Sequence, residues 1–278
     1  PDYLDENGVI SDNAFSSSLP IVGSGSSHGG FSGGSDGHSG FDALGNQNGN
    51  RGTSAVNFYE NITETNSQGF NPTADDDGKN AYTEALDLLA NQDEFDINLI
   101  LLPGIIDSIH TTVASKAIDV CESRGDCFTI IDPVPYGSTV TAAITRGDTR
   151  DSNFAAMYWP WVKVPDSQVT GAQRWVPPSV VLGGIYAFND RVAHPWFAPA
   201  GLNRGGITTA IQAERKLTQG NRDDLYDSNI NPIATFPGQG VTVFGQKTLQ
   251  KKSSALDRIN VRRLLIRLKK FIASTSRF

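Results

Sequence analysis

The sequence of 278 residues has few cysteines, a single methionine and no long apolar run. Cys121 and Cys127 are too few for a disulfide-stapled fold, and their C-x5-C spacing is neither a zinc nor a redox signature. The longest apolar run, Ile97 to Ile106, is interrupted by Asn98 and is shorter than the ~18 residues of a membrane helix. The first residues are polar and acidic, so no signal peptide is expected. These absences disfavour a small secreted scaffold and an integral membrane protein.

Charge is distributed unevenly along the chain. Residues 1–96 carry 16 acidic and two basic side chains, whereas residues 247–278 carry one acidic and ten basic ones. The net charge of -7 conceals this asymmetry. It predicts a solvated acidic part and a basic end that binds an anionic partner: nucleic acid, a membrane surface or an acidic protein surface.

The amino-terminal part lacks the composition of a core. Residues 23–52 consist largely of Gly, Ser, Asn and Asp, which cannot bury enough apolar area to offset the entropy of ordering the backbone. We interpret residues 1–70 as an acidic irregular region with a flexible surface loop. Because the chain begins without methionine and stops at Phe278 inside a helical pattern, we interpret it as a fragment of a longer protein.

Strand and helix patterns alternate after residue 71. A helix is predicted at 80–90, with Ala81, Ala85, Leu88 and Leu89 on one side. The following segments are a strand at 97–102 closed by Pro103-Gly104, a helix at 106–122, a strand at 128–131, a helix at 138–146 and a strand at 154–164. This alternation predicts βαβ units and a mainly parallel sheet. A helix from Pro178, strands at 230–233 and 241–244, and a last helix at 255–274 complete the pattern.

Residues for catalysis are scarce. A nucleophile–base pair would need His110 or His194, and neither lies in a recognisable motif. Cys121 and Cys127 are interpreted as small buried hydrophobic residues in a reducing compartment. No pair of carboxylates is marked as acid and base. The sequence therefore favours a protein that is not an enzyme.

The last helix is the most informative segment for function. Val261, Leu264, Leu265, Leu268 and Ile272 form a narrow apolar stripe, which we expect to pack on the protein. Cations occupy the rest of the helix and are expected to face an acidic partner. These candidate site residues are Arg258, Arg262, Arg263, Arg267, Lys269 and Lys270.

A string of short segments in the second half of the chain is distinctive in its order and spacing. The segments are Tyr158-Trp159-Pro160-Trp161, Val176-Pro177-Pro178-Ser179, Gly183-Gly184-Ile185-Tyr186-Ala187 with Asp190, Trp196-Phe197-Ala198-Pro199-Ala200-Gly201, Ile230-Asn231-Pro232-Ile233, Gly240-Val241-Thr242-Val243-Phe244-Gly245, and Ile259-Asn260-Val261-Arg262-Arg263-Leu264. Together they resemble the contractile tail sheath proteins of bacteriophages, T4-like myophages above all, and of related contractile injection systems. The resemblance extends over about residues 71–278. Phe244, where many members have Trp, and Gln246-Lys247, where many have Ala-Arg, depart from the family pattern.

The resemblance implies a subtilisin-like α/β core at 71–218, followed by a smaller, truncated α+β domain at 219–278, with both terminal arms of the family missing. It implies a subunit that polymerises as stacked hexameric rings around a tail tube and contracts to drive the tube through a cell envelope. Tube, baseplate and tail terminator proteins are the implied partners, with no cofactor, metal, nucleic acid or membrane insertion. The implied location is the virion tail, assembled in the host cytoplasm. A hydrolase with the same core, or a nucleic-acid binder using the basic tail, are the alternatives.

Overall fold

A computed structural model describes residues 77–166 and 171–276. The predictions for residues 1–70 and for the loop at 23–52 lie outside the described residues. No helix in the described ranges is both long and apolar enough to span a bilayer.

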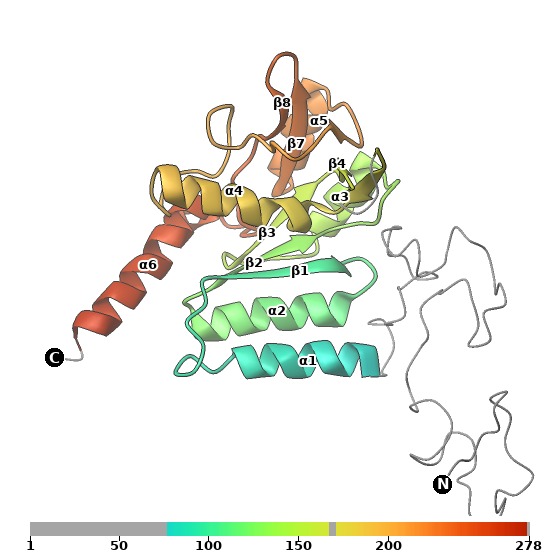
Figure 1. The fold of residues 1–278 in the computed structure, drawn as a ribbon. Coiled ribbons are helices and arrows are strands. Elements are labelled where there is room, and N and C mark those ends of the chain that lie inside the picture. The colour runs from blue at the N-terminus through green and yellow to red at the C-terminus, as the bar shows by residue number, and fades with distance from the viewer. Residues whose placement is uncertain (1–76, 167–170, 277–278) are drawn as a thin grey trace, which may run out of the picture. The chain divides into compact units, whose positions relative to one another are not determined.

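The centre of the fold is a five-stranded sheet in the order β1-β2-β3-β7-β8. The first four strands are parallel, and β8 pairs antiparallel with β7, which confirms the predicted mainly parallel sheet. In Figure 1, α1 and α2 lie on one side of this sheet and α4 on the other. The strands are β1 (Leu99–Ile106), β2 (Phe128–Asp132), β3 (Ala155–Trp159), β7 (Ile230–Phe236) and β8 (Gly240–Val243).

A smaller antiparallel sheet and six α-helices complete the described fold. The small sheet has the order β5-β4-β6. Its strands are β4 (Val162–Pro165), β5 (Gln173–Val176) and β6 (Gln212–Ala213). The helices are α1 (Asp77–Leu89), α2 (Thr111–Arg124), α3 (Val140–Gly147), α4 (Pro178–Val192), α5 (Gln219–Asp227) and α6 (Ile259–Thr275), with a 3-10 turn, η3 (Ala255–Asp257), before α6.

The interior strands owe their position to continuous apolar sequence. Every residue of β2 and of β3 is buried, as expected for strands covered on both faces. Strand β7 joins the same sheet by parallel pairing with β3, from Met157 opposite Ile230 to Trp159 opposite Pro232. The boundary expected between residues 218 and 219 is therefore not a boundary of the sheet, and the division into domains stays a prediction.

Three local predictions need correction. Strand β1 is an edge strand that continues past Pro103 to Ile106, and the helix expected from residue 106 begins at Thr111. An edge strand tolerates a proline because one side of its backbone needs no ladder partner. The strand expected at 154–164 is two strands, because β3 ends at Trp159 and β4 begins at Val162 in the other sheet. Helix α1 buries Leu86 (2% exposed), whereas Leu88 of the expected face is 57% exposed.

Candidate interaction surface

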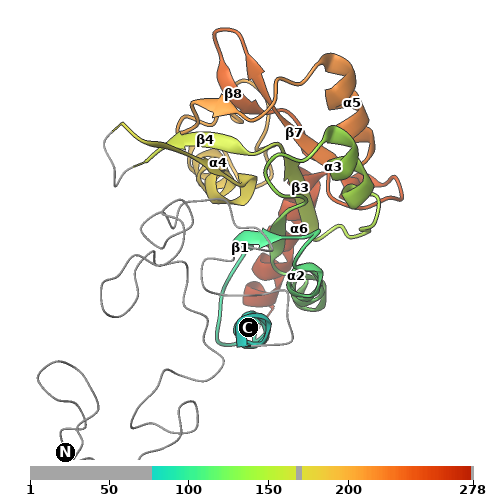
Figure 2. The same ribbon diagram turned by 90° about the vertical axis from the view of Figure 1, so that its right-hand side faces the viewer.

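Helix α6 crosses the amino-terminal ends of the parallel strands. Its side chains contact residues that precede three of them: Asp96 before β1, Arg124 before β2 and Asn153 before β3. In Figure 1 the helix lies on the side where β1 begins, and in Figure 2, seen from the opposite side, it lies behind the strands. Ligands of open α/β sheets bind at the opposite, carboxyl ends of the strands. The basic helix therefore lies away from the place where an enzyme of this architecture would hold its substrate.

The rotation of α6 about its axis differs from the prediction. The residues buried against the body are Ile259, Arg262, Arg263 and Ile266. Three residues of the expected contact stripe point outward instead: Leu265 is 40%, Leu268 41% and Ile272 60% exposed. Val261 and Leu264 are half-buried. The prediction that the stripe packs on the core is therefore wrong for these three residues.

Two of the predicted cations are buried in the protein. Arg263 forms two hydrogen bonds to the Asp190 carboxylate, at 2.8 and 2.6 Å, and lies over the Tyr186 ring. Arg262 donates to Asn153 Oδ1 at 2.5 Å and stacks on Phe154. Burial lowers the pKa of Arg262. Both guanidinium groups thus fix the helix to the rest of the described chain.

Three more of the predicted cations also bind within the chain. Lys270 bonds to Asp96 at 2.5 Å and to the carbonyl of Ile97 at 2.6 Å, and its hydrogen bond and charge lower the pKa of Asp96. Lys269 donates to the carbonyl oxygen of Arg124. Arg258, just before the helix, pairs with Asp257 at 3.2 Å and donates to the Tyr226 hydroxyl.

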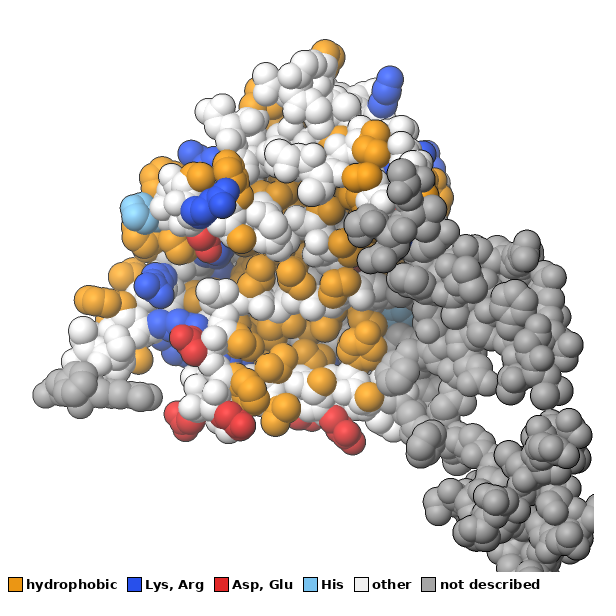
Figure 3. All heavy atoms as spheres, viewed as in Figure 1, with side chains coloured by type: hydrophobic (Ala, Val, Ile, Leu, Met, Phe, Trp, Pro, Cys, Tyr) orange, Lys and Arg blue, Asp and Glu red, His pale blue; other side chains and the backbone are white. Residues whose placement is uncertain are grey.

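Arg267 is the last of the six predicted cations, and it differs from the other five. It is exposed and has no hydrogen bond or ion pair to the residues that the structure describes. It borders a hollow of about 110 Å³ that Arg263, Ile266 and Lys270 also line. Figure 3 shows basic and acidic side chains side by side where α6 meets the body, with apolar side chains along the outer part of the helix. The available surface of α6 is thus Arg267 with the outward stripe.

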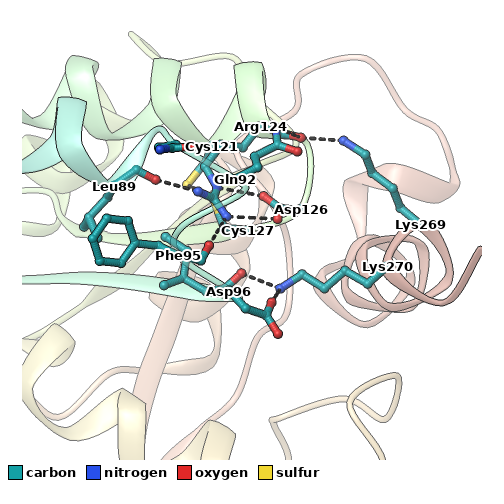
Figure 4. Close-up of polar contacts among 12 residues, drawn as sticks. Leu89, Gln92, Phe95, Asp96, Cys121, Arg124, Asp126, Cys127, Lys269 and Lys270 are labelled. Atoms are coloured by element: carbon teal, nitrogen blue, oxygen red, sulfur yellow. Dashed lines mark hydrogen bonds and ion pairs between the residues drawn. The ribbon is translucent and has the colours of Figure 1, made fainter. Parts of the chain in front are cut away.

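The residue that anchors this region is Arg124, which was not among the predicted site residues. Its guanidinium is fully buried, pairs with Asp126 at 2.8 and 3.0 Å, and donates to the carbonyls of Leu89 (2.6 Å) and Phe95 (2.8 Å). Gln92 and Lys269 both donate to its backbone oxygen. We call this set of contacts the Arg124 knot (Figure 4). It joins α2, the connection between α1 and β1, and α6. The signal was an arginine at a helix end two residues before an aspartate.

The buried aspartates at the carboxyl ends of β1 and β2 each accept hydrogen bonds from within the chain. Asp107, buried after β1, bonds to Arg146 at 2.5 Å and to Arg150 at 2.5 and 3.2 Å. Asp132, at the end of β2, accepts hydrogen bonds from the Ser179 backbone N–H (3.0 Å) and hydroxyl (2.5 Å). Burial raises the pKa of Asp132 to about 7.

The two histidines of the described ranges, His110 and His194, are each held by a neighbouring group. Nδ1 of His110 accepts a hydrogen bond from the backbone of Ile106 at 2.9 Å, and burial lowers the pKa of His110 to about 4. His194 is stacked on Trp196. In residues 77–166 and 171–276, no three His, Cys, Asp or Glu side chains gather as a metal site would require.

Comparison with known proteins identifies a family and relatives with similar sequences. Residues 78–249 match the family model described as the phage tail sheath protein central domain. The tail sheath proteins of Vibrio phage KVP40 and of Enterobacteria phage T4 are each 32% identical to this chain, over 72% and 70% of its length. The match covers 34% and 32% of those proteins, so the chain spans about a third of each relative.

Solved structures show the same similarity. The sheath complex of an extracellular contractile injection system (PVC) in its contracted state is 28% identical, with a TM-score of 0.52 over 66% of this chain and 49% of that one. The contracted baseplate of the anti-feeding prophage contains a chain that is 25% identical, with a TM-score of 0.54 over 69% of this chain and 51% of that one.

Proposed function

Because the chain belongs to the phage tail sheath family, we propose that it is part of a structural subunit of a contractile tail sheath. The observation that carries this proposal is the family match over residues 78–249, which spans β1 to β8 of the α/β body. In this role the whole protein polymerises as stacked hexameric rings around a tail tube. Contraction of the rings drives the tube through the target envelope.

The proposed role is mechanical rather than enzymatic. A sheath subunit must keep its shape while its contacts with neighbours change. Fully buried strands such as β2 and β3 suit this requirement, as do the ion pairs that hold α6 to α4 and the end of α2 to the turn before β2. The energy for contraction is stored in the interfaces between subunits, so the role needs no nucleotide or metal. Heterologous contacts that do not close into a ring produce such helical assemblies.

The finer features of the family belong to the same proposal. We propose a subtilisin-like arrangement of the α/β core, with the second domain beginning near residue 219. The partners are further copies of the chain, the tail tube, the baseplate and the tail terminator. The place of action is the virion tail. Support comes from the names of the relatives, which are tail sheath proteins and sheath and baseplate complexes.

We propose that the contact surface of α6 includes one of the six predicted cations. Arg267 and the outward residues Leu268, Phe271 and Ile272 face the tail tube or a neighbouring subunit. Arg258, Arg262, Arg263, Lys269 and Lys270 hold the helix in the orientation that presents this face. An exposed ion pair contributes roughly 0.2–1 kcal/mol, and repetition along a tail multiplies it. Such weak contacts suit a sheath that slides on its tube.

Electron microscopy of the full-length protein with its tail tube tests both proposals. The wild type should form helical sheaths, and their absence would count against the function. Arg267→Glu should shorten sheaths on tubes and make assembly more sensitive to salt, without lowering the melting temperature of the monomer. Lys252→Glu, a charge reversal at an exposed residue outside α6, is the matched control. Normal sheaths with both variants would refute the α6 surface and leave the function standing.

A further inference from the structure

Two buried thiols lie in contact where helix α2 gives way to strand β2. Cys121 is in the last turn of α2 and Cys127 directly precedes β2. Both are free and fully buried, and their sulfur atoms are 3.2 Å apart. The S–S bond of a disulfide is about 2.05 Å long. We propose that hydrogen peroxide converts this pair into a reversible disulfide that closes the end of α2 around Arg124.

The chain between the two cysteines is built as a tight turn. Gly125 ends α2 with a positive φ of 65°, and its N–H bonds to the carbonyl of Cys121 at 2.8 Å. This turn brings the chain back so that Cys127 meets Cys121 across the helix end. A disulfide here needs the two sulfur atoms to approach, with little rearrangement of the rest of the fold. The juxtaposition is invisible in the sequence, where C-x5-C matches no known redox motif.

The surroundings favour oxidation of the pair over metal binding. The pair lies in an apolar cluster with Leu86, Val113 and Val120, and a third metal-ligating side chain is lacking among the described residues. The hydrogen bond between the two sulfurs and burial raise the pKa of the Cys121 thiol, while the same hydrogen bond lowers the pKa of Cys127. Cys127 is therefore the sulfur that ionises first and attacks.

The reaction proceeds in two balanced steps. The Cys127 thiolate attacks one oxygen of hydrogen peroxide, the O–O bond breaks, and hydroxide leaves, so that Cys127 becomes a sulfenic acid. The sulfur of Cys121 then attacks the sulfenic sulfur and displaces the second hydroxide, which forms the S–S bond. The two thiol protons end in two molecules of water, and two electrons pass from the sulfurs to peroxide. Contact between the sulfurs means that the sulfenic acid is captured before it is oxidised further.

The consequence reaches beyond the two cysteines because Arg124 lies between them in sequence. The disulfide would limit opening of the turn that carries Arg124 and Asp126. Through the Arg124 knot, it would also restrain the connection from α1 to β1 and the part of α6 around Lys269. Oxidation is thus expected to reduce opening of both segments. This proposal does not depend on sheath assembly.

The test is mass spectrometry of the whole folded chain treated with hydrogen peroxide. Catalase stops the reaction, and the protein is then denatured and alkylated. The expected product has lost two hydrogen atoms, takes up no alkyl group and yields a peptide linking Cys121 to Cys127. Dithiothreitol should restore two thiols. Hydrogen exchange should slow at residues 89–97 and 266–272 in the oxidised form.

Two controls make the result decisive. Cys121→Ala leaves the attacking sulfur without its partner, so Cys127 should accumulate sulfinic or sulfonic acid and no loss of two hydrogens should occur. The wild type unfolded in urea should form the linked peptide more slowly than the folded protein, because its sulfurs are no longer held together. Two alkylatable thiols after treatment, separate over-oxidation of both cysteines, or disulfides between chains would overturn the proposal. Equal rates in folded and unfolded protein would overturn it as well.

Discussion

Helices α2 and α6 both carry an apolar stripe at helical spacing, yet α2 packs its stripe and α6 leaves much of its stripe exposed. In α2, Val113, Ala117 and Val120 are buried, as their spacing predicts. In α6, Ile259, Arg262, Arg263 and Ile266 are buried instead. The difference comes from what each helix meets. Helix α2 lies against a predominantly apolar surface. Helix α6 crosses the strand ends, where carboxylates and backbone carbonyls accept hydrogen bonds from its basic side chains.

This contrast shows that an amphipathic helix can bury arginine side chains against the protein while apolar side chains stay exposed. A guanidinium buried with a carboxylate in two-point contact makes charge-assisted bonds that have no equivalent among apolar contacts. Its stem also covers apolar surface, as Arg262 does on Phe154 and Arg263 on Tyr186. Helical periodicity identifies the helix, but the partners determine its rotation.

The largest effect is expected from replacing Arg124, the buried arginine that joins α2 to α6. Arg124→Met should lower the free energy of unfolding by about 3–5 kcal/mol, because Asp126 and two carbonyls lose their donor inside the protein. Chemical denaturation measures this change. Arg267→Met, an exposed arginine of α6, is the control and should change stability by less than about 0.5 kcal/mol. A loss below about 1 kcal/mol for Arg124→Met would show that the knot is not a structural anchor.

A second test asks whether Asp190 sets the rotation of α6. A double-mutant cycle with Arg263→Met and Asp190→Asn should give a coupling free energy of about 1–2 kcal/mol. The two-point contact at 2.8 and 2.6 Å is the reason. The cycle of Arg267→Met with Asp190→Asn should give a value near zero. Equal couplings in the two cycles would mean that the observed pairing does not orient the helix.

A third test uses pH on the entry to α2. Since burial lowers the pKa of His110 to about 4, folding favours the neutral ring. Its contribution to stability is complete above the ordinary pKa near 6.5 and is lost as pH falls toward 4. The slope due to this residue is at most about 1.4 kcal/mol per pH unit. His110→Gln should flatten stability in this window, and an unchanged slope would argue against a buried neutral histidine.

The smallest effect is expected on the outward face of α6. Leu268→Ala should change the free energy of unfolding by less than about 0.5 kcal/mol because the side chain is already exposed. Ile118→Ala, at a buried position of α2, is the comparison and should cost about 2–5 kcal/mol. If Leu268→Ala proved as costly as Ile118→Ala in the isolated chain, the orientation of α6 given above would be incorrect.

Much of the fold follows from local sequence. Continuous apolar runs identify β2 and β3, Pro178 identifies the start of α4, and Pro237-Gly238 separates β7 from β8. The position of β1 was harder to predict. Its apolar run resembles that of an interior strand, and whether a strand is interior or at the edge depends on which strands pair with it. Strand pairing is a property of the whole sheet, so the sequence of a single segment does not reveal it.

The candidate surface could be predicted in part. The sequence alone located a basic amphipathic helix at the end of the chain and connected it with an assembly. Asp190 and Arg263 both lie in segments that carry the family resemblance, but nothing in either segment indicates that they bond to each other. They are 73 residues apart, and only the fold brings α4 and α6 together.

The sequence by itself determined the alternation of strands and helices, the parallel sheet and the family, because hydrophobic periodicity and short motifs are local properties. The tertiary structure decided which face of α6 is available, how Arg124 joins α2 to α6, and that Cys121 touches Cys127. Each of these depends on distances between groups separated along the chain. Burial gives such contacts their strength, since a charge or thiol inside the protein has lost its water and depends on the partner beside it.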